Sequence, residues 1–566
     1  LLYMPWANFP LANQRQSGFL APSFGTSNKT GLDIATPYYI NLAPNYDATV
    51  TPRVMSTRGV QLGGEFRYLT KEYAGNSRLE WMPRDDQTGG GRGAGSIQHQ
   101  QTFMPGFTGA VNFNRVSDSQ YFQDLSTNLT NVSRSNLIQE GTLTYGAAGW
   151  WNVTGRLQSF QTLNGSEPYR RLPQVVFNAL RPQFLGGTSA AFLGDYTQFV
   201  AAPGAGHQPE GSRTVLYPQL SLPIETTYFS ITPKVGVHST TYDLSTPVSP
   251  GNNSFSRTLP IASVDSTVVF ERDVSWGGKS FIQTLEPRVY YLYVPFQNQS
   301  PSKYPVFDTA YYDYNFAQIF AENIFSGQDR IANANQVTAA VTSRLIDPGS
   351  GAQVLKAALG QRYYFADQEV ILNAGDTART GKRADIVAAL GGEIMRKTTL
   401  DTGWQYDPNN GNTERFDFNL RYQPEVAKAL GIAWRYKRNS ENTDPNNPDG
   451  YRDIDITGQW PLWGRWYGVG RYNRSLQDHR NIETIAGVEY NGGCWVLRSA
   501  FHQYVTRKDN QSASSIENST STTGFYLSLE FNGLTSLGSS PVSLLRRSVP
   551  GYSSISDTRI FNDDTE

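Results

Sequence analysis

The chain has 566 residues, 48 basic and 49 acidic side chains and a formal net charge of −1, so it lacks the basic excess expected of a nucleic-acid-binding surface. Hydrophobic residues make up 38% of the chain and the mean hydropathy is −0.46, yet 13% of the residues are aromatic. No run of about 18 apolar residues occurs, which argues against a transmembrane helix. The single cysteine, Cys494, excludes a disulfide within the chain.

The first 30 residues contain several prolines and predict one or two short strands. The opening residues 1–6 have no basic segment followed by an apolar one, so they do not resemble a signal peptide. We therefore expect the sequence to be a mature or truncated form of a longer protein.

From residue 31 to residue 531 the sequence repeats segments of about ten residues in which apolar and polar side chains alternate. The pattern is clearest in 60–68, 416–423, 432–437 and 525–532. Successive side chains of a strand point to opposite faces, so each segment has an apolar, often aromatic, face and a polar face. This is typical of a transmembrane β-barrel, whose apolar side chains face lipid and whose polar side chains face a lumen.

The connections between these segments are rich in Gly, Asn and Asp, and no long periodic helix is predicted. Residues 315–325 could form a short helix, a strand or a loop. After Phe531 the alternation is lost, and residues 532–566 are expected to form an irregular C-terminal tail.

The length of the repeating region predicts the size of the barrel. One strand with its share of the connections takes roughly 20 residues, so the chain supplies about 24–28 strands. With strands ~4.8 Å apart and tilted ~40°, the barrel diameter is on the order of 50 Å. Side chains cannot fill such a lumen, and no plug domain is visible in the sequence. We therefore expect a separate partner inside the barrel.

Seven stretches are more specific than composition, and they occur in the same order as in one known family. They are 37–49 (PYYINLAPNYDAT), 117–125 (SDSQYFQDL), 168–174 (PYRRLPQ), 285–295 (LEPRVYYLYVP), 307–309 (FDT), 324–336 (IFSGQDRIANANQ) and 548–552 (SVPGY). With these stretches the chain resembles the LPS-assembly protein LptD (Imp/OstA) family over nearly its whole length.

The resemblance implies an all-β protein, a barrel of 26 strands in the outer membrane of a Gram-negative bacterium. It implies that the barrel inserts lipopolysaccharide into the outer leaflet and that a lipoprotein plug, LptE, sits inside it. It also implies an N-terminal periplasmic β-jellyroll that receives lipopolysaccharide from periplasmic bridge proteins. On this basis residues 1–30 are the end of the jellyroll and its link, 31–531 the barrel and 532–566 the tail.

The resemblance also suggests a lateral gate, a weak seam between the first barrel strand, about 32–42, and the last, about 521–531. Proline removes a ladder hydrogen bond, so Pro37 and Pro52 would weaken this region. Phe525, Leu527 and Leu529 would form the other side of the gate. The alternative is that both prolines simply mark strand ends near turns.

Cys494 departs from the family, which often has two adjacent cysteines at this place. The resemblance implies that Cys494 pairs with a cysteine in the N-terminal domain, while the alternative is a free thiol.

Five charged residues are candidates for contacts with the plug or within the lumen. They are Asp308, Asp329, Arg330, Arg67 and Arg421. Arginines on the polar faces, among them Arg53, could bind lipid phosphates, but ion pairs within the lumen are the more ordinary role.

No catalytic, cofactor or metal site is predicted. Ser499 and His502 are the one tempting hydrolase pair, and no motif supports them. We therefore predict a lipopolysaccharide translocon rather than an enzyme. The alternative is another large outer-membrane transporter or receptor.

Overall fold

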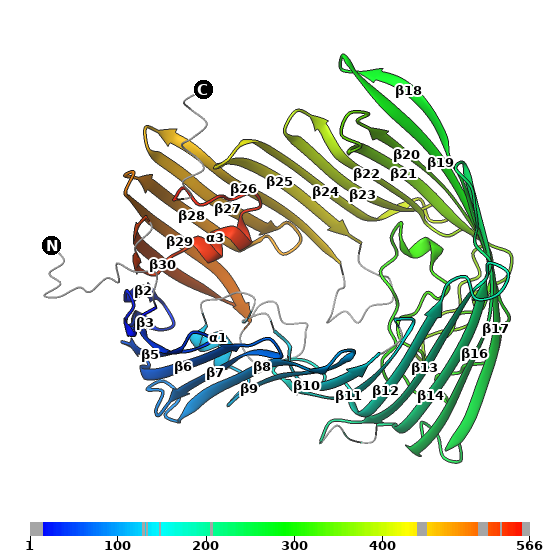
Figure 1. Cartoon of the computed structure of the whole chain (residues 1–566), viewed down its shortest axis with the longest axis horizontal. Helices are drawn as coiled ribbons and strands as arrows, with labels where there is room; N and C mark the ends of the chain where they lie inside the picture. Colours follow the sequence, from blue (N-terminus) through cyan, green and yellow to red (C-terminus); the bar gives the residue numbers. More distant parts are fainter. Residues whose placement is uncertain are drawn as a thin grey trace, which may run out of the picture.

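The computed structural model describes residues 15–126, 131, 134–146, 149–203, 206, 208–438, 450–507, 519–532 and 535–556. All the strands within these ranges belong to one antiparallel sheet, which closes on itself as a barrel of 26 strands; Figure 1 shows the closed wall. The predicted fold class and strand number are thus confirmed. None of the helices within the described ranges is both long and apolar enough to cross a membrane.

The first half of the barrel runs from β1 to β15 and includes one short helix. The elements are β1 (Gly18–Phe19), β2 (Ser23–Ser27), β3 (Gly31–Ala35), β4 (Tyr38–Ala43), β5 (Tyr46–Met55), β6 (Gly59–Leu69), β7 (Tyr73–Met82), β8 (Arg92–Met104), β9 (Phe107–Val116), α1 (Tyr121–Leu125), β10 (Asn136–Tyr145), β11 (Trp151–Thr162), β12 (Arg170–Arg181), β13 (Ser189–Val200), β14 (Glu210–Ser221) and β15 (Ile224–Glu225).

The second half completes the barrel and ends in a short strand and a helix. The elements are β16 (Phe229–Thr246), β17 (Ser254–Val268), β18 (Phe270–Trp276), β19 (Lys279–Val294), η1 (Gln318–Phe320), β20 (Ala334–Ile346), β21 (Gln353–Tyr364), β22 (Ile386–Met395), β23 (Thr398–Asp407), β24 (Asn412–Glu425), β25 (Lys428–Lys437), β26 (Tyr451–Trp463), β27 (Trp466–Ser475), β28 (Arg480–Asn491), β29 (Trp495–Arg507), β30 (Ser519–Phe531), β31 (Thr535–Gly538) and α3 (Val542–Ser548).

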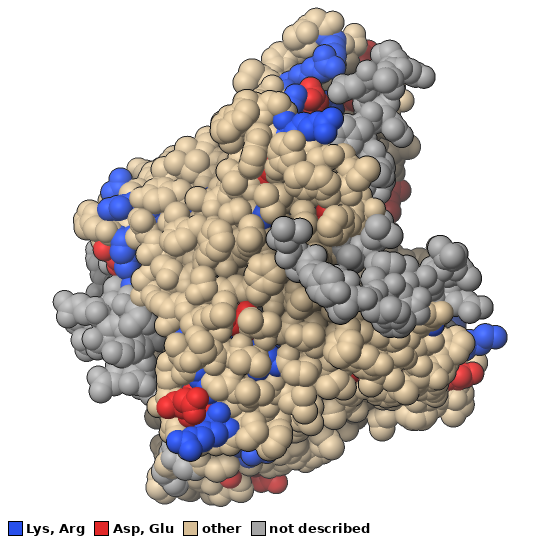
Figure 2. Space-filling model, turned by 90° about the vertical axis from the view of Figure 1, so that its left-hand side faces the viewer, with Lys and Arg blue, Asp and Glu red and all other residues tan. Residues whose placement is uncertain are grey.

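The alternation seen in the sequence sets which side chains face outward. In β6, Val60 is 52% exposed and Leu62 44% exposed, whereas Gln61 between them is buried. Apolar side chains therefore cover the outside of the wall and polar ones the inside. Figure 2 shows the side of the barrel that carries β2 and β30, where charged side chains are sparse in the middle and gather toward the margins.

The start of the barrel differs from the prediction. The strand that pairs with β30 is β2, and residues 31–43 form the second strand as β3 and β4. β1 and β2 belong to the same sheet, so the barrel begins before the boundary expected at residue 31. The error arose because Pro22 divides the first strand into two pieces too short to show an alternating pattern.

The two ends of the barrel differ in their connections. At one end the strands are joined by turns such as 44–45, 105–106 and 464–465, and we call this the short-turn end. At the opposite end, the long-loop end, the connections include 117–135 and 295–333. Within 315–325 only η1 is helical, so the short helix considered for this stretch reduces to a single 3₁₀ turn.

The buried clusters lie where loops and the C-terminal segment pack on the inner wall. The segment α1 packs on Met55, Met82 and Val116 near the long-loop end. The helix α3 packs on Val469 and Ile485 of β27 and β28. The region after Phe531, expected to be irregular, thus contains a strand, a helix and buried side chains.

Candidate functional site

The seam that closes the barrel is short. β2 and β30 share three paired positions, Gly25 with Tyr526, Thr26 with Phe525 and Ser27 with Gly524. By contrast, β29 pairs with β30 along all of its 13 residues. Beyond the paired positions the Asn28 side chain donates to the carbonyl of Ser521 at 2.9 Å. Few hydrogen bonds therefore hold the first strand to the last.

Three prolines lie side by side across the first three strands. Pro22 separates β1 from β2, and Pro37 separates β3 from β4. Pro52 lies within β5, and its carbonyl accepts a bond from the Thr36 amide at 3.0 Å. Pro37 and Pro52 were predicted from the sequence, but Pro22 was not. Its place opposite Thr36 in the hairpin was the signal that could have identified it.

Proline within a strand does not by itself mark this region. Prolines also occur inside unbroken strands far from the seam, at Pro218, Pro233, Pro260, Pro287 and Pro461. What distinguishes the seam is that the ladder stops at Pro22 and Pro37 and resumes beyond them.

The segment around α1 lies on the luminal side of the seam and touches both of its sides. Toward the first strands, Tyr121 donates to Glu80 at 2.7 Å, and the carbonyl of Leu125 accepts from Arg53 at 3.1 Å. Toward the last strands, the carbonyl of Ser126 accepts from Tyr504 at 3.4 Å. A cavity of about 300 Å³ remains between this segment, β2 and β30.

A buried ionic cluster fixes the α1 segment to the long-loop end. Arg92 contacts Asp85 at 2.9 Å, Asp118 at 2.7 Å and Asp124 at 2.8 Å, and Arg58 contacts Asp85 at 2.8 Å. Burial raises the pKa of Asp118, but hydrogen bonds from Arg92 and the neighbouring Ser117 outweigh it, and the net pKa is lowered.

Lys29 links the first hairpin turn to the same segment. Its ammonium donates to the carbonyl of Gln123. Burial lowers the pKa of Lys29 to about 8; the negative charge of Asp124 opposes this effect, and the positive charge of Arg58 adds to it. Arg53, considered as a phosphate ligand, is instead held by Asp33 at 2.5 Å.

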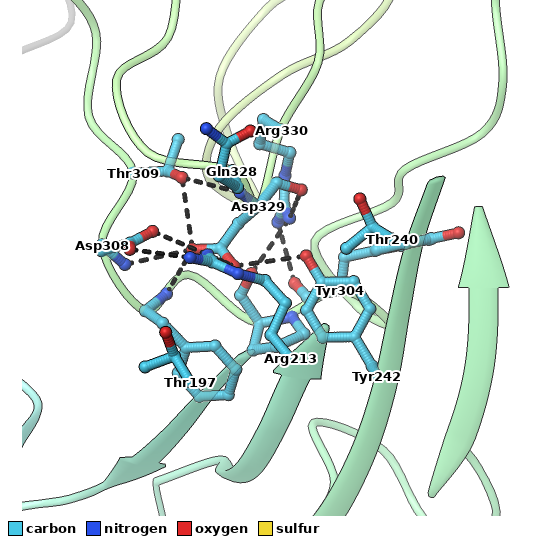
Figure 3. Close-up of polar contacts among 12 residues, drawn as sticks. Thr197, Arg213, Thr240, Tyr242, Tyr304, Asp308, Thr309, Gln328, Asp329 and Arg330 are labelled. Carbon is cyan, nitrogen blue, oxygen red and sulfur yellow. Dashed lines mark hydrogen bonds and ion pairs between the residues drawn. The ribbon is translucent and has the colours of Figure 1, made fainter. Parts of the chain in front are cut away.

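A second polar network holds the loop 295–333 against another part of the wall (Figure 3). Arg213 of β14 is fully buried and contacts Asp329 at 2.6 Å and Asp308 at 2.7 Å. The Asp329 carboxylate also accepts from Tyr242 at 3.2 Å and from the Phe307 amide at 2.8 Å. Its many donors make Asp329 the centre of the network.

Of the five predicted plug or lumen residues, three come together in this loop. Asp308 and Asp329 share Arg213, and Arg330 donates to the carbonyl of Tyr304 at 2.8 Å. Arg67 lies apart on β6 and pairs with Asp47 at 2.7 Å while half exposed. Arg421 is half-buried on β24, away from that network.

The predicted gate residues of the last strand face outward. Phe525 is 43% exposed and lies between Thr26 and Phe501. Leu527 and Leu529 follow at the same spacing, toward the short-turn end. Cys494 is exposed in the turn between β28 and β29, and its carbonyl accepts from the Asn532 amide at 2.9 Å.

The hydrolase pair finds no support in the geometry. Ser499 and His502 are three residues apart in β29, so their side chains point to opposite faces. His502 faces the lumen and contacts Glu483 at 2.8 Å.

Sequence reasoning missed the luminal role of the C-terminal segment. Tyr552 donates to Glu489 at 2.6 Å, and Glu489 in turn contacts the fully buried Arg498 at 2.9 Å. The Ser554 hydroxyl accepts from Arg498 at 2.8 Å. The motif 548–552 was the available signal, but its partners on the wall could not be assigned without the fold.

Known proteins resemble the chain as strongly as the motifs suggested. Residues 90–466 match the family model described as LptD, LPS transport system D. The chain is 52% identical to the LPS-assembly protein LptD of Aromatoleum aromaticum over 557 residues, covering 98% of this chain and 68% of that protein. The chain belongs to the LptD family.

Other relatives agree. The LPS-assembly proteins LptD of an Azoarcus species and of Thiobacillus denitrificans are 51% and 42% identical, covering 99% and 98% of this chain and 68% and 72% of those proteins. Among solved structures, the match to the siderophore receptor PiuA of Acinetobacter baumannii covers 92% of this chain and 76% of that chain. The identity is 7% and the TM-score is 0.26, so this likeness supports no argument.

Membership of this family makes the chain an outer-membrane β-barrel of the lipopolysaccharide transport system of Gram-negative bacteria. Outer-membrane barrels have short periplasmic turns and longer extracellular loops. The short-turn end is therefore periplasmic and the long-loop end extracellular.

Proposed function

We propose that the chain inserts lipopolysaccharide into the outer leaflet through a lateral gate between β2 and β30. The observation that supports the proposal is the seam itself, which has three paired positions where the neighbouring pair β29–β30 has a full ladder. A closed barrel opens most easily where the fewest hydrogen bonds join two strands.

The chemistry of the cargo explains why a gate is needed. The sugar part of lipopolysaccharide can cross inside a polar lumen. The acyl chains cannot stay in water, because exposed apolar area costs about 25 cal/mol per Å². The molecule must therefore leave sideways, and the seam is the weakest part of the wall.

A reversible crosslink tests the gate. Thr26→Cys with Phe525→Cys, in a Cys494→Ser background, places two thiols at paired positions of β2 and β30. We expect oxidation to stop newly made lipopolysaccharide from reaching the cell surface, and reduction to restore it. Leu420→Cys with Ile432→Cys joins β24 to β25 instead, away from the seam, and should leave delivery unchanged. Normal delivery with the seam crosslink fully formed would refute the gate.

We also propose two kinds of partner for the barrel. A lipoprotein plug, LptE, would occupy a lumen on the order of 50 Å wide. Periplasmic bridge proteins would supply lipopolysaccharide through an N-terminal β-jellyroll.

Cys494 lies in a periplasmic turn by the orientation given above, where a disulfide to the N-terminal domain could form. We propose this pairing. Oxidised full-length protein should migrate differently from reduced protein on a gel, and Cys494→Ser should abolish the difference. Equal mobility of the oxidised and reduced wild type would contradict the pairing.

A further inference from the structure

The edge of β30 is shared between two partners. β2 pairs with positions 524–526, toward the extracellular end. Toward the periplasmic end, β31 pairs with the same edge, placing Leu537 beside Leu529 and Ser536 beside Glu530. β1, which precedes β2, pairs with β4 and not with β30. The periplasmic half of the seam is therefore closed by a strand from the C-terminal segment.

β2, β30 and β31 meet at Gly538. The Gly538 amide donates to the carbonyl of Pro22 at 2.8 Å. Its φ is +86°, and a Cβ at this position would lie 2.2 Å from the carbonyl oxygen of Leu527 and 3.2 Å from the Phe24 ring. Only glycine fits here without moving one of the strands. The junction is thus built for close approach of the C-terminal segment to the first strand.

The residues after β31 anchor it to the luminal wall. Leu544 and Leu545 of α3 are buried against Val469 and Ile485. Beyond α3, the Ser553 carbonyl accepts from Gln459 at 2.9 Å, and the Ile555 carbonyl accepts from Asn491 at 3.0 Å. The anchor rests on β26–β28, which belong to the continuous part of the wall. β31 is thereby held at the seam from inside the barrel.

β31 itself forms fewer contacts than its anchor. It has four residues and pairs with β30 alone as a strand. Release of β31 from the edge breaks these four pairs and the bond from the Gly538 amide to the Pro22 carbonyl. β31 can therefore leave the edge while α3 and the residues beyond it keep the segment in place.

We propose that β31 is a displaceable closing strand for the periplasmic half of the lateral gate. The inference rests on the gate proposed above. Lipopolysaccharide comes from the periplasmic side, so its acyl chains meet the half of the seam that β31 covers before they meet the half that β2 covers. Opening the gate then has two steps, release of β31 from β30 and separation of β2 from β30.

A crosslink that fixes β31 tests the proposal without touching β2. Leu529→Cys with Leu537→Cys, in the Cys494→Ser background, joins β31 to β30 at paired positions. We expect oxidation after assembly to reduce surface delivery of newly made lipopolysaccharide at least tenfold, and reduction to restore it. Reversal in the same cells shows that the barrel had folded. The pair at 420 and 432 serves again as the control.

The two crosslinks separate the two proposals. If the pair at 26 and 525 blocks delivery while the pair at 529 and 537 leaves it normal, β31 has no part in opening and the inference is overturned, while the gate stands. If neither blocks delivery, the gate itself fails, and the inference fails with it.

A substitution that loosens β31 gives an independent readout. Gly538→Val places a side chain against the Leu527 carbonyl. We expect a lower yield of the disulfide between positions 529 and 537 and greater entry of large antibiotics, with the yield of the control disulfide between positions 420 and 432 unchanged. An undiminished yield at 529 and 537 would show that β31 does not depend on this junction, contrary to the inference.

Discussion

At the scale of single residues, the buried arginines of the lumen depend on a few carboxylates. Asp329 accepts from Arg213, Tyr242 and the Phe307 amide, all within the network that holds loop 295–333. Asp329→Asn keeps the shape but removes the charge, leaving Arg213 with Asp308 alone. Loss of one partner of a buried ion pair costs about 3–5 kcal/mol, so we expect a lower unfolding midpoint in denaturant and faster proteolysis of the loop.

Arg67→Gln is the matched control, because it also breaks an arginine–aspartate pair. Arg67 is half exposed, and such pairs contribute about 1 kcal/mol or less. Equal effects of the two substitutions on the unfolding midpoint would show that Asp329 is not the centre of a buried network.

Lys29, which contacts the α1 segment, makes the stability of the folded protein depend on pH. Its pKa is lowered from 10.5 to about 8 in the folded protein, so between these values the unfolded chain binds more protons. Stability therefore rises with pH across this window, and below it the destabilising contribution of charged Lys29 is fully present and no longer changes with pH. Lys29→Met should flatten the rise in unfolding midpoint between about pH 8 and pH 9.5. Identical slopes for the two proteins would contradict the lowered pKa.

At the scale of elements, prolines and strand breaks set the strength of the seam. Pro37→Ala with Pro52→Ala would restore two backbone donors near the first strands. We expect slower lipopolysaccharide delivery from a barrel that still assembles, measured as the rate at which new lipopolysaccharide reaches the surface. Pro287→Ala with Pro461→Ala, in unbroken strands away from the seam, should have no effect. Equal slowing by both pairs would mean that proline acts on the whole barrel.

The sequence predicted those strands in which apolar and polar side chains alternate over enough residues to be recognised. β30 was expected at about 521–531 and spans Ser519–Phe531. β2 falls among the short strands predicted for the first 30 residues, but it was assigned outside the barrel, because its five residues contain only one large apolar side chain, Phe24. β31 and α3 were missed because their burial depends on wall strands far away in the sequence, which no local pattern reveals.

At the scale of the whole molecule, the number of strands dictates a wide lumen. A ring of 26 strands has a diameter on the order of 50 Å. We expect large conductance from the isolated barrel in planar bilayers, and a fall in conductance when the lipoprotein is added. Small conductance from a homogeneous isolated barrel would show that the chain fills its own lumen.

The fold class was readable from the alternation, and the length limited the strand number to about 24–28; the number 26 was implied by the resemblance to the LptD family. The candidate site was only partly readable. Motifs identified Pro37, Pro52, Asp308 and Asp329. The residues that lie next to them, Pro22 and Arg213, could not be assigned, because only the closed sheet shows which parts of the chain are neighbours.

The position of the C-terminal segment constrains the order in which the protein is built. Tyr552 is buried inside the barrel, on a wall formed by β26–β29, although β30 precedes it in the chain. A completed ring would have to admit this segment through its periplasmic mouth. The simplest sequence of events places the segment against the inner wall while the sheet is still open, so that pairing of β2 with β30 is the last step of biogenesis. The join that we propose to open for transport is then also the join that is made last.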